Sequence, residues 1–249
     1  MRSLNFKQAH SLLLLTLLGS ALLSGCGGSS TPGAGNLNNS VETESVEVRV
    51  ERGPVLYSHV VDSVGVKGQF SGSNVYSFSL TPTYPIKALG GFIDLDNSQT
   101  LTAGDLPMGN LALQASEGSV LTIGSTLANS TDFLDTLINL GFTETQLTTQ
   151  TPTDDKMVAA LSDAVFEYAV KNAITDLSQM SSTELSDLTT AIEARMSDYQ
   201  QSDLSALQLE SDLVTTLTDA NYVSPLTSEE AAELATMATS NPLAVTQAS

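Results

Sequence analysis

The chain has 249 residues, and its 28 acidic side chains against 9 Lys and Arg give a formal charge of −19 at neutral pH. A surface this acidic repels the phosphate backbone of nucleic acids, so the composition argues against nucleic acid as a partner. The single cysteine excludes a disulfide within the chain, and two histidines are too few for a zinc site built from His and Cys.

The first 25 residues have the organisation of an export signal. Arg2 and Lys7 form a basic start, and residues 11–23 form an apolar run that is too short to span about 30 Å of hydrocarbon. The run ends in Leu23-Ser24-Gly25-Cys26, which resembles the lipobox of bacterial lipoproteins. The alternative is an ordinary secretory signal with an incidental cysteine, but the only cysteine of the chain stands at this one position.

The resemblance implies that Cys26 is acylated and becomes the N-terminus of the mature protein. Two or more acyl chains give stable anchoring, so the implied partner is the lipid bilayer. Gly27 stands where an aspartate would resemble the signal for inner-membrane retention, which favours the outer membrane or the cell surface. Residues 26–40 are rich in Gly, Ser and Asn and carry no charge, and we expect a lipidated flexible tether there.

Residues 41–125 have the pattern of short β-strands. Val46, Val48 and Val50 alternate with charged residues, which indicates a strand with one buried face and, next to the tether, an edge that could add to a neighbour's sheet. Further strand-like runs lie between turn-forming residues, at 55–66, 75–80, 86–93, 111–113 and 120–123. This pattern predicts a small antiparallel β-sandwich.

The order Gly53-Pro54-Val55, Val60-Val61-Asp62, Gly65 and Val75-Tyr76-Ser77-Phe78 resembles the transthyretin-like or carboxypeptidase-regulatory-like β modules of bacterial surface proteins. Such a module is usually a spacer or a binding platform and seldom the catalyst. The resemblance therefore implies a supporting or binding role for residues 41–125.

Residues 94–105 carry oxygen-bearing side chains at the spacing of a twelve-residue calcium loop. Counted from Asp94, they fall at positions one, three, five, nine and twelve, and position seven offers its backbone carbonyl. Leu101, at position eight, is expected to point into the core. Calcium prefers six to eight oxygen ligands, and a flexible oxygen-rich loop suits calcium better than magnesium. The candidate metal ligands are Asp94, Asp96, Ser98, Thr100, Thr102 and Asp105.

Two positions depart from the EF-hand pattern. Gln99 stands at position six, where glycine would adopt the positive φ of the turn, and this costs about 1 kcal/mol. Asp105 stands at position twelve, where an EF-hand has a bidentate glutamate, and the shorter acid resembles the dockerin type of loop. The alternative interpretation of this segment is an acidic, solvated turn that binds no metal.

Residues 126–249 have the periodicity of helices. The strongest helix is expected over 154–178, where two apolar stripes predict burial on more than one side. Ser181-Ser182-Thr183-Glu184 and Thr227-Ser228-Glu229-Glu230 have the spacing of capping boxes, and a further helix is expected over 203–219. The chain as a whole is predicted to be α+β, with a small antiparallel β-sandwich followed by a C-terminal helical bundle.

Catalytic groups are scarce. His59 is the one histidine after the signal, and Asp62 would lie on the opposite face of a regular strand, so a Ser-His-Asp triad is not indicated. We predict a lipid-anchored protein that is not an enzyme and that has a calcium-stabilised loop. Its expected role is adhesion, assembly or envelope structure, where assembly means filaments or binding to a surface protein. The alternatives are a lipoprotein that binds a ligand or peptide in a pocket of the helical domain, and a hydrolase that uses paired carboxylates.

Overall fold

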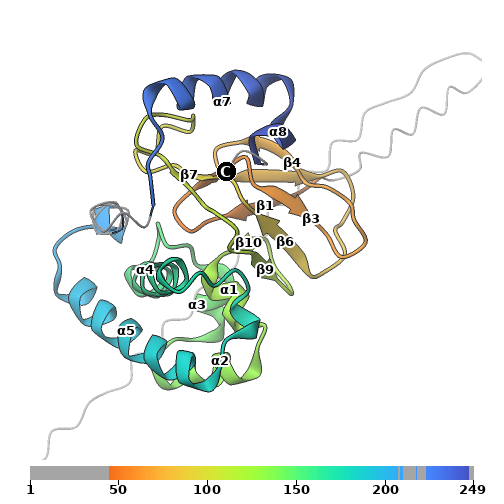
Figure 1. Ribbon diagram of the computed structural model, residues 1–249. Helices are drawn as coiled ribbons and strands as arrows, with labels where there is room; N and C mark the ends of the chain where they lie inside the picture. Colours follow the sequence, from red (N-terminus) through yellow and green to blue (C-terminus); the bar gives the residue numbers. More distant parts are fainter. Residues whose placement is uncertain (1–44, 207, 210–216, 218–222, 247–249) are drawn as a thin grey trace, which may run out of the picture. The chain divides into compact units, whose positions relative to one another are not determined.

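The computed structural model describes residues 45–206, 208–209, 217 and 223–246 (Figure 1). The predicted export signal, Cys26 and the tether lie outside these residues, and so does most of the predicted helix over 203–219. Among the helices that are described, none combines the length and the hydropathy needed to cross a membrane.

β1 (Val46–Val50) is a central strand of a four-stranded sheet. It pairs with β10 (Val120–Leu121) in parallel and with β5 (Val75–Phe78) in antiparallel orientation, and β4 (Gln69–Gly72) pairs with the other side of β5. Two of the three valines of β1 are fully buried, as their alternation with charged residues predicts. β10 pairs only with Arg49 and Val50, so the expected free edge is closed at that end of β1, whereas Val46–Val48 have no described partner strand on the same side.

The other described strands form two antiparallel sheets of three strands each. One has the order β2 (Val55–Leu56), β7 (Phe92–Ile93), β8 (Leu106–Pro107), and the other has the order β3 (His59–Val61), β6 (Ile86–Leu89), β9 (Leu113–Ala115). The predicted combination of helices and strands is confirmed. The finer prediction, an antiparallel sandwich followed by a helical bundle, is not confirmed, because the strands are divided among three small sheets and β1 and β10 are parallel.

The described helices follow the strands along the chain. They are α1 (Ile123–Ala128), α2 (Thr131–Asn139), α3 (Glu144–Thr149), α4 (Lys156–Lys171), α5 (Ser182–Gln201), α7 (Ser228–Ser240) and α8 (Pro242–Thr246), with a 3-10 turn, η1 (Leu177–Gln179). Both predicted capping boxes are present, one with Ser181 at the start of α5 and one with Thr227 at the start of α7. Each hydroxyl accepts the backbone N–H of a glutamate three residues later, which satisfies a donor at the helix end.

The larger of two hydrophobic clusters joins strands to helices. Side chains of β1, β5 and β6 belong to the same cluster of buried residues as those of α4 and α5, and the described residues lie within one compact unit. α4 packs against both α1 and α5, so the predicted burial of this helix on more than one side is confirmed.

A buried glutamate joins the four-stranded sheet to the segment before α4. Glu51 directly follows β1 and is 2% exposed. Its carboxylate accepts hydrogen bonds from the Asn74 amide at 2.6 Å and from the Thr153 hydroxyl at 2.9 Å, and Arg49 Nη1 lies 3.8 Å away. Burial raises the pKa of Glu51 above its usual value, although these neighbours favour the charged form.

This raised pKa predicts a change in stability with pH. The folded state holds the Glu51 proton more tightly than the unfolded state, so the stabilisation that Glu51 provides is complete below the unfolded pKa and is lost as the pH rises through the folded pKa. Glutamine does not titrate. We therefore expect Glu51→Gln to become more stable relative to the parent chain as the pH rises from about 4 to about 7.

Urea unfolding at several pH values within that range measures this difference directly. Glu117→Gln removes the same charge from an exposed turn and serves as the matched control. If the free energies of unfolding of Glu51→Gln and of the parent chain change in parallel with pH, the pKa of Glu51 is not raised in the folded state.

Candidate metal centre

The predicted calcium loop connects two paired strands. Asp94 directly follows β7 and Asp105 directly precedes β8, and β7 and β8 are antiparallel with Ile93 opposite Leu106. This pairing places the first and the twelfth residue of the loop next to each other at its base. The strand register therefore brings together two carboxylates that are eleven residues apart in the sequence.

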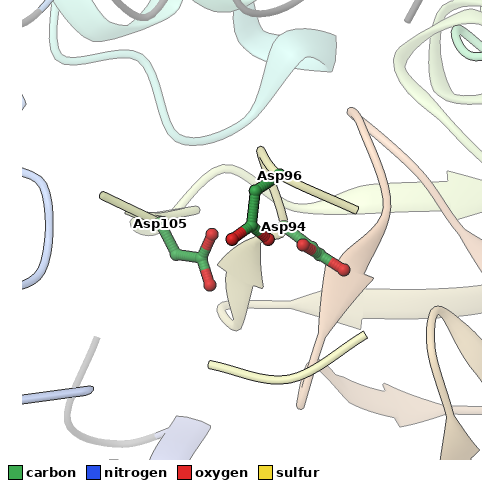
Figure 2. Close-up of side chains that lie close together, drawn as sticks. All are labelled: Asp94, Asp96 and Asp105. Atoms are coloured by element: carbon green, nitrogen blue, oxygen red, sulfur yellow. The ribbon is translucent and has the colours of Figure 1, made fainter. Parts of the chain in front are cut away.

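Three carboxylates meet at this base. One oxygen of each of Asp94, Asp96 and Asp105 lies within 4.8 Å of the others, and Figure 2 shows the three side chains gathered together. Asp94 and Asp105 are each 1% exposed, whereas Asp96 is exposed. The cluster is thus open to solvent on the side of Asp96 and closed on the other.

Backbone N–H groups of the loop point at these carboxylates. Asp94 accepts hydrogen bonds from Ser98 N at 3.0 Å and Gln99 N at 2.7 Å. Asp105 accepts from Leu95 N at 3.2 Å and Thr102 N at 2.8 Å. The side-chain oxygens at positions one and twelve are therefore held in place by the loop itself.

The three hydroxyl residues predicted as ligands differ in their placement. Thr102 donates its hydroxyl hydrogen to Asp96 at 3.0 Å and so lies beside the cluster. The Ser98 hydroxyl instead donates to the Thr100 carbonyl at 2.9 Å, and both of these residues are exposed. Asp94, Asp96, Thr102 and Asp105 are thus brought together. Ser98 lies next to them as well, since its N–H donates to the Asp96 carboxylate at 3.0 Å, while its hydroxyl bonds to Thr100.

The backbone of the loop has the form that its sequence pattern predicts. Gln99, at position six, has a φ of +64°, which is the left-handed conformation expected there in spite of the missing glycine. Leu101, at position eight, is 7% exposed and packs in a hydrophobic cluster. A solvated turn would require neither feature, so both favour a loop wound around its carboxylates.

Burial changes the acidity of the carboxylates. It raises the pKa of Asp94 to about 6, with smaller contributions from the nearby Asp96 and Asp105, and it also raises the pKa of Asp105. Hydrogen bonding, mainly from the Ser98 side chain, lowers the pKa of Asp96. Within the described part of the chain, these carboxylates make no ion pair with Lys or Arg. A divalent cation would supply the missing positive charge.

The loop also holds the C-terminal helices, which the sequence did not indicate. Gly104 N donates to the Leu226 carbonyl at 3.0 Å, and Leu226 N donates to the Asp105 carbonyl at 2.9 Å. Leu101 packs in one hydrophobic cluster with Leu56 and Phe92 of the sheet and with residues of the last two helices, Leu234, Ala238 and Val245. The conformation of the loop and the position of α7 and α8 are therefore coupled.

The residues considered for a catalytic triad have other roles. Asp62 accepts hydrogen bonds from Val64 N at 3.1 Å, Val66 N at 2.7 Å and Thr83 N at 2.9 Å, so it caps the turn that follows β3. These bonds, mainly the one from Thr83, lower the pKa of Asp62. His59 lies in β3 and is half-buried. Comparisons of the chain with protein-family models, with curated proteins and with solved structures find no match.

Proposed function

We propose that residues 94–105 form a structural calcium site in a lipid-anchored envelope or surface protein that is not an enzyme. Calcium would neutralise the cluster of Asp94, Asp96 and Asp105 and hold α7 and α8 against the sheet of β2, β7 and β8. The observation that carries this proposal is the convergence of three carboxylates, two of them buried, at the spacing of a calcium loop.

The oxygen donors suit a hard cation. Carboxylate and hydroxyl oxygens are ligands of calcium and magnesium, and the loop offers no nitrogen or sulfur donor. With three carboxylates, a dissociation constant of about 10⁻⁴–10⁻³ M is expected, which is the range of extracellular calcium modules. The proposed location agrees with this value, since the lipobox-like signal ending in Cys26 favours export to a compartment where calcium is abundant.

The same features favour a supporting role over catalysis. The calcium loop lies between short strands and joins distant segments of the chain, which is what a structural ion does. A platform of this kind, attached to lipid through a tether, would present the folded part to another envelope protein or to a further copy of itself. The finer description of the chain as a β module followed by a helical bundle belongs to this proposal.

A thermal melt tests the calcium site. For the full-length chain with Cys26→Ser, which cannot be acylated, we expect about 5 mM CaCl₂ to stabilise the folded state by about 1–2 kcal/mol relative to EDTA. This corresponds to a rise in Tm of roughly 2–8 °C for a chain of this size. Magnesium at the same concentration should raise the Tm less, because the flexible loop does not impose an octahedron.

The control compares two pairs of aspartates. Asp94→Asn with Asp96→Asn should abolish the calcium-dependent rise in Tm. Asp187→Asn with Asp198→Asn removes the same charge from exposed positions of α5 and should retain it. Equal shifts in both double variants, or no shift in the parent chain, would rule out the proposed site.

A further inference from the structure

A groove lies between β3, the start of β4 and α8, and none of residues 94–105 lines it. Two cavities of about 510 Å³ and 280 Å³ share four lining residues, His59, Lys67, Leu243 and Thr246, and so form one continuous depression. α8 is held against its wall because the Thr246 hydroxyl donates to the Tyr57 carbonyl. Volumes of this size are typical of sites for small molecules.

The walls of the groove are partly apolar and open to solvent. Leu89, from β6, is 44% exposed, and Leu243, from α8, is 40% exposed, so two large aliphatic side chains face the larger cavity without being covered. Tyr57 and Phe70 line the smaller cavity, with ring centroids 4.4 Å apart. A ligand that covered these side chains would remove apolar surface from water.

The charge of the groove is opposite to that of the chain. None of the residues that line either cavity is acidic, although the chain has 28 acidic residues against 9 Lys and Arg. Three further cavities of the described residues each include a carboxylate in their lining, from Asp176, Glu184, Glu230 or Glu233. Lys67 lines both parts of the groove and makes no ion pair within the described residues.

His59 is the second polar group of interest. It lines both cavities beside Lys67, and burial, followed by the charge of Lys67, lowers its pKa. The other elements around the groove contribute no titratable group to it apart from Tyr57, since the lining residues of α8, β6 and the 109–110 turn are neutral. A cationic ammonium and an imidazole thus share an acid-free groove.

We propose that this groove binds a small molecule with one carboxylate on an apolar body. The carboxylate would lie between Lys67 and His59, and the body would cover Leu89 and Leu243. A single ammonium beside an imidazole matches one negative charge. A phosphate dianion carries a second negative charge that one lysine would leave unmatched, and the groove offers no arginine.

Titration calorimetry with octanoate tests this assignment, using the full-length chain with Cys26→Ser in buffer with calcium. We expect saturable binding, and about tenfold weaker binding of octanol, which has the same body without the charge. Lys67→Gln should weaken octanoate binding by about tenfold. Lys87→Gln, which removes a lysine from β6 that lines another cavity, is the matched control and should bind like the parent chain.

Two further measurements locate the ligand. Leu243→Glu places a negative charge on the apolar wall and should abolish octanoate binding while the Tm stays near that of the parent, since this side chain is exposed. The NMR titration of the His59 ring, assigned by its loss in His59→Gln, should show a higher pKa when octanoate is bound, because a carboxylate favours the protonated ring.

Several results would overturn the proposal. They are the absence of octanoate binding, equal affinities for octanoate and octanol, inorganic phosphate binding as tightly as octanoate, an unchanged affinity in Lys67→Gln, and an unchanged pKa of His59 in the presence of octanoate. None of these variants alters residues 94–105. Because the calcium proposal also concerns the position of α8, the calcium-dependent rise in Tm is measured alongside for each variant, so that failure of the calcium site and failure of the groove can be told apart.

Discussion

Asp163→Ala is expected to lower the free energy of unfolding by about 3–5 kcal/mol, the range measured when one partner of a buried ion pair is removed. Asp163 Oδ1 lies 2.9 Å from Arg52 Nη1, and both side chains have no exposed surface. Truncation at residue 163 would leave the Arg52 guanidinium buried without this counter-charge. Arginine carries its charge permanently, so the buried guanidinium would stay cationic.

The position of this pair explains why its loss would affect the whole fold. Arg52 lies in the turn between β1 and β2, Asp163 lies in α4, and the Tyr199 hydroxyl of α5 donates to the Asp163 carboxylate. The Arg52 guanidinium also stands over the Phe166 ring, 4.7 Å from its centroid. One interaction thus connects the first sheet to the two longest described helices.

Urea unfolding at about pH 8 measures the effect, since burial raises the pKa of Asp163 to about 6 and the carboxylate is charged above that value. Asp198→Ala, at an exposed position of α5, is the control and should change stability by less than about 0.5 kcal/mol. The double variant Arg52→Met with Asp163→Leu should recover much of the loss, because an apolar pair removes both buried charges. A loss below about 1 kcal/mol in Asp163→Ala would show that the pair is not needed.

Gly91→Ala is the second substitution with a large expected effect, a loss of about 2–5 kcal/mol. Gly91 lies between β6 and β7 with a φ of +94°, and a left-handed alanine costs about 1–2 kcal/mol. A Cβ atom there would also lie 2.6 Å from the Leu56 carbonyl oxygen and 2.8 Å from Ser58 N. These are backbone atoms of β2 and of the link from β2 to β3, so relief of the clash requires the backbone to move, at a further cost of about 1–3 kcal/mol.

Gly65→Ala separates the two contributions. Gly65 has a nearly identical φ of +89°, but a Cβ atom there would meet no other atom within 4 Å. It should therefore show only the cost of the backbone conformation, about 1–2 kcal/mol. Equal losses of stability in the two variants, measured by urea unfolding, would contradict the steric part of the explanation.

Local patterns predicted the features that leave a short-range signal in the sequence. The alternation at Val46–Val50 predicts β1 with its bounds, and the serine and threonine capping boxes predict the starts of α5 and α7. The spacing of oxygen donors over 94–105 likewise predicts the left-handed Gln99 and the buried Leu101. In each case the signal is short in the sequence: an alternation of period two, a cap of four residues or a spacing of twelve.

The errors arose at the ends and edges of strands, where a neighbouring element decides how far the strand extends and what pairs with it. The apolar run at 120–123 was expected to be a strand throughout, but it ends as β10 at Leu121 because Thr122 caps α1. The strand over 46–50 has the composition of an edge strand, yet β10 pairs with it from more than 70 residues away. Pairing of that kind leaves no periodic signal in either segment.

The carboxylate cluster was predicted in part from the sequence and in part depends on the tertiary structure. The spacing from Asp94 to Asp105 follows from the sequence, and the lipobox at Cys26 is also a prediction from sequence alone. That Asp94 and Asp105 are buried, and that Asp105 is bonded to Leu226, depends on how α7 and α8 cover the loop. The spacing in the sequence determines which carboxylates can come together. Their burial, and with it the raised pKa of Asp94 and Asp105, comes from the elements that pack over the loop.

The pair of Arg52 with Asp163 and the groove around Lys67 depend entirely on packing. Their side chains come from segments about 110 and 180 residues apart, and no motif marks any of them. From sequence alone, a polar side chain is expected at the surface. Whether it is buried depends on hydrophobic contacts that other residues make in the core. The sequence by itself therefore determines the loop over 94–105 and its oxygen ligands. The packing of remote helices against the sheets determines that Arg52 and Asp163 form a buried ion pair and that Lys67 lies in a groove without acidic residues.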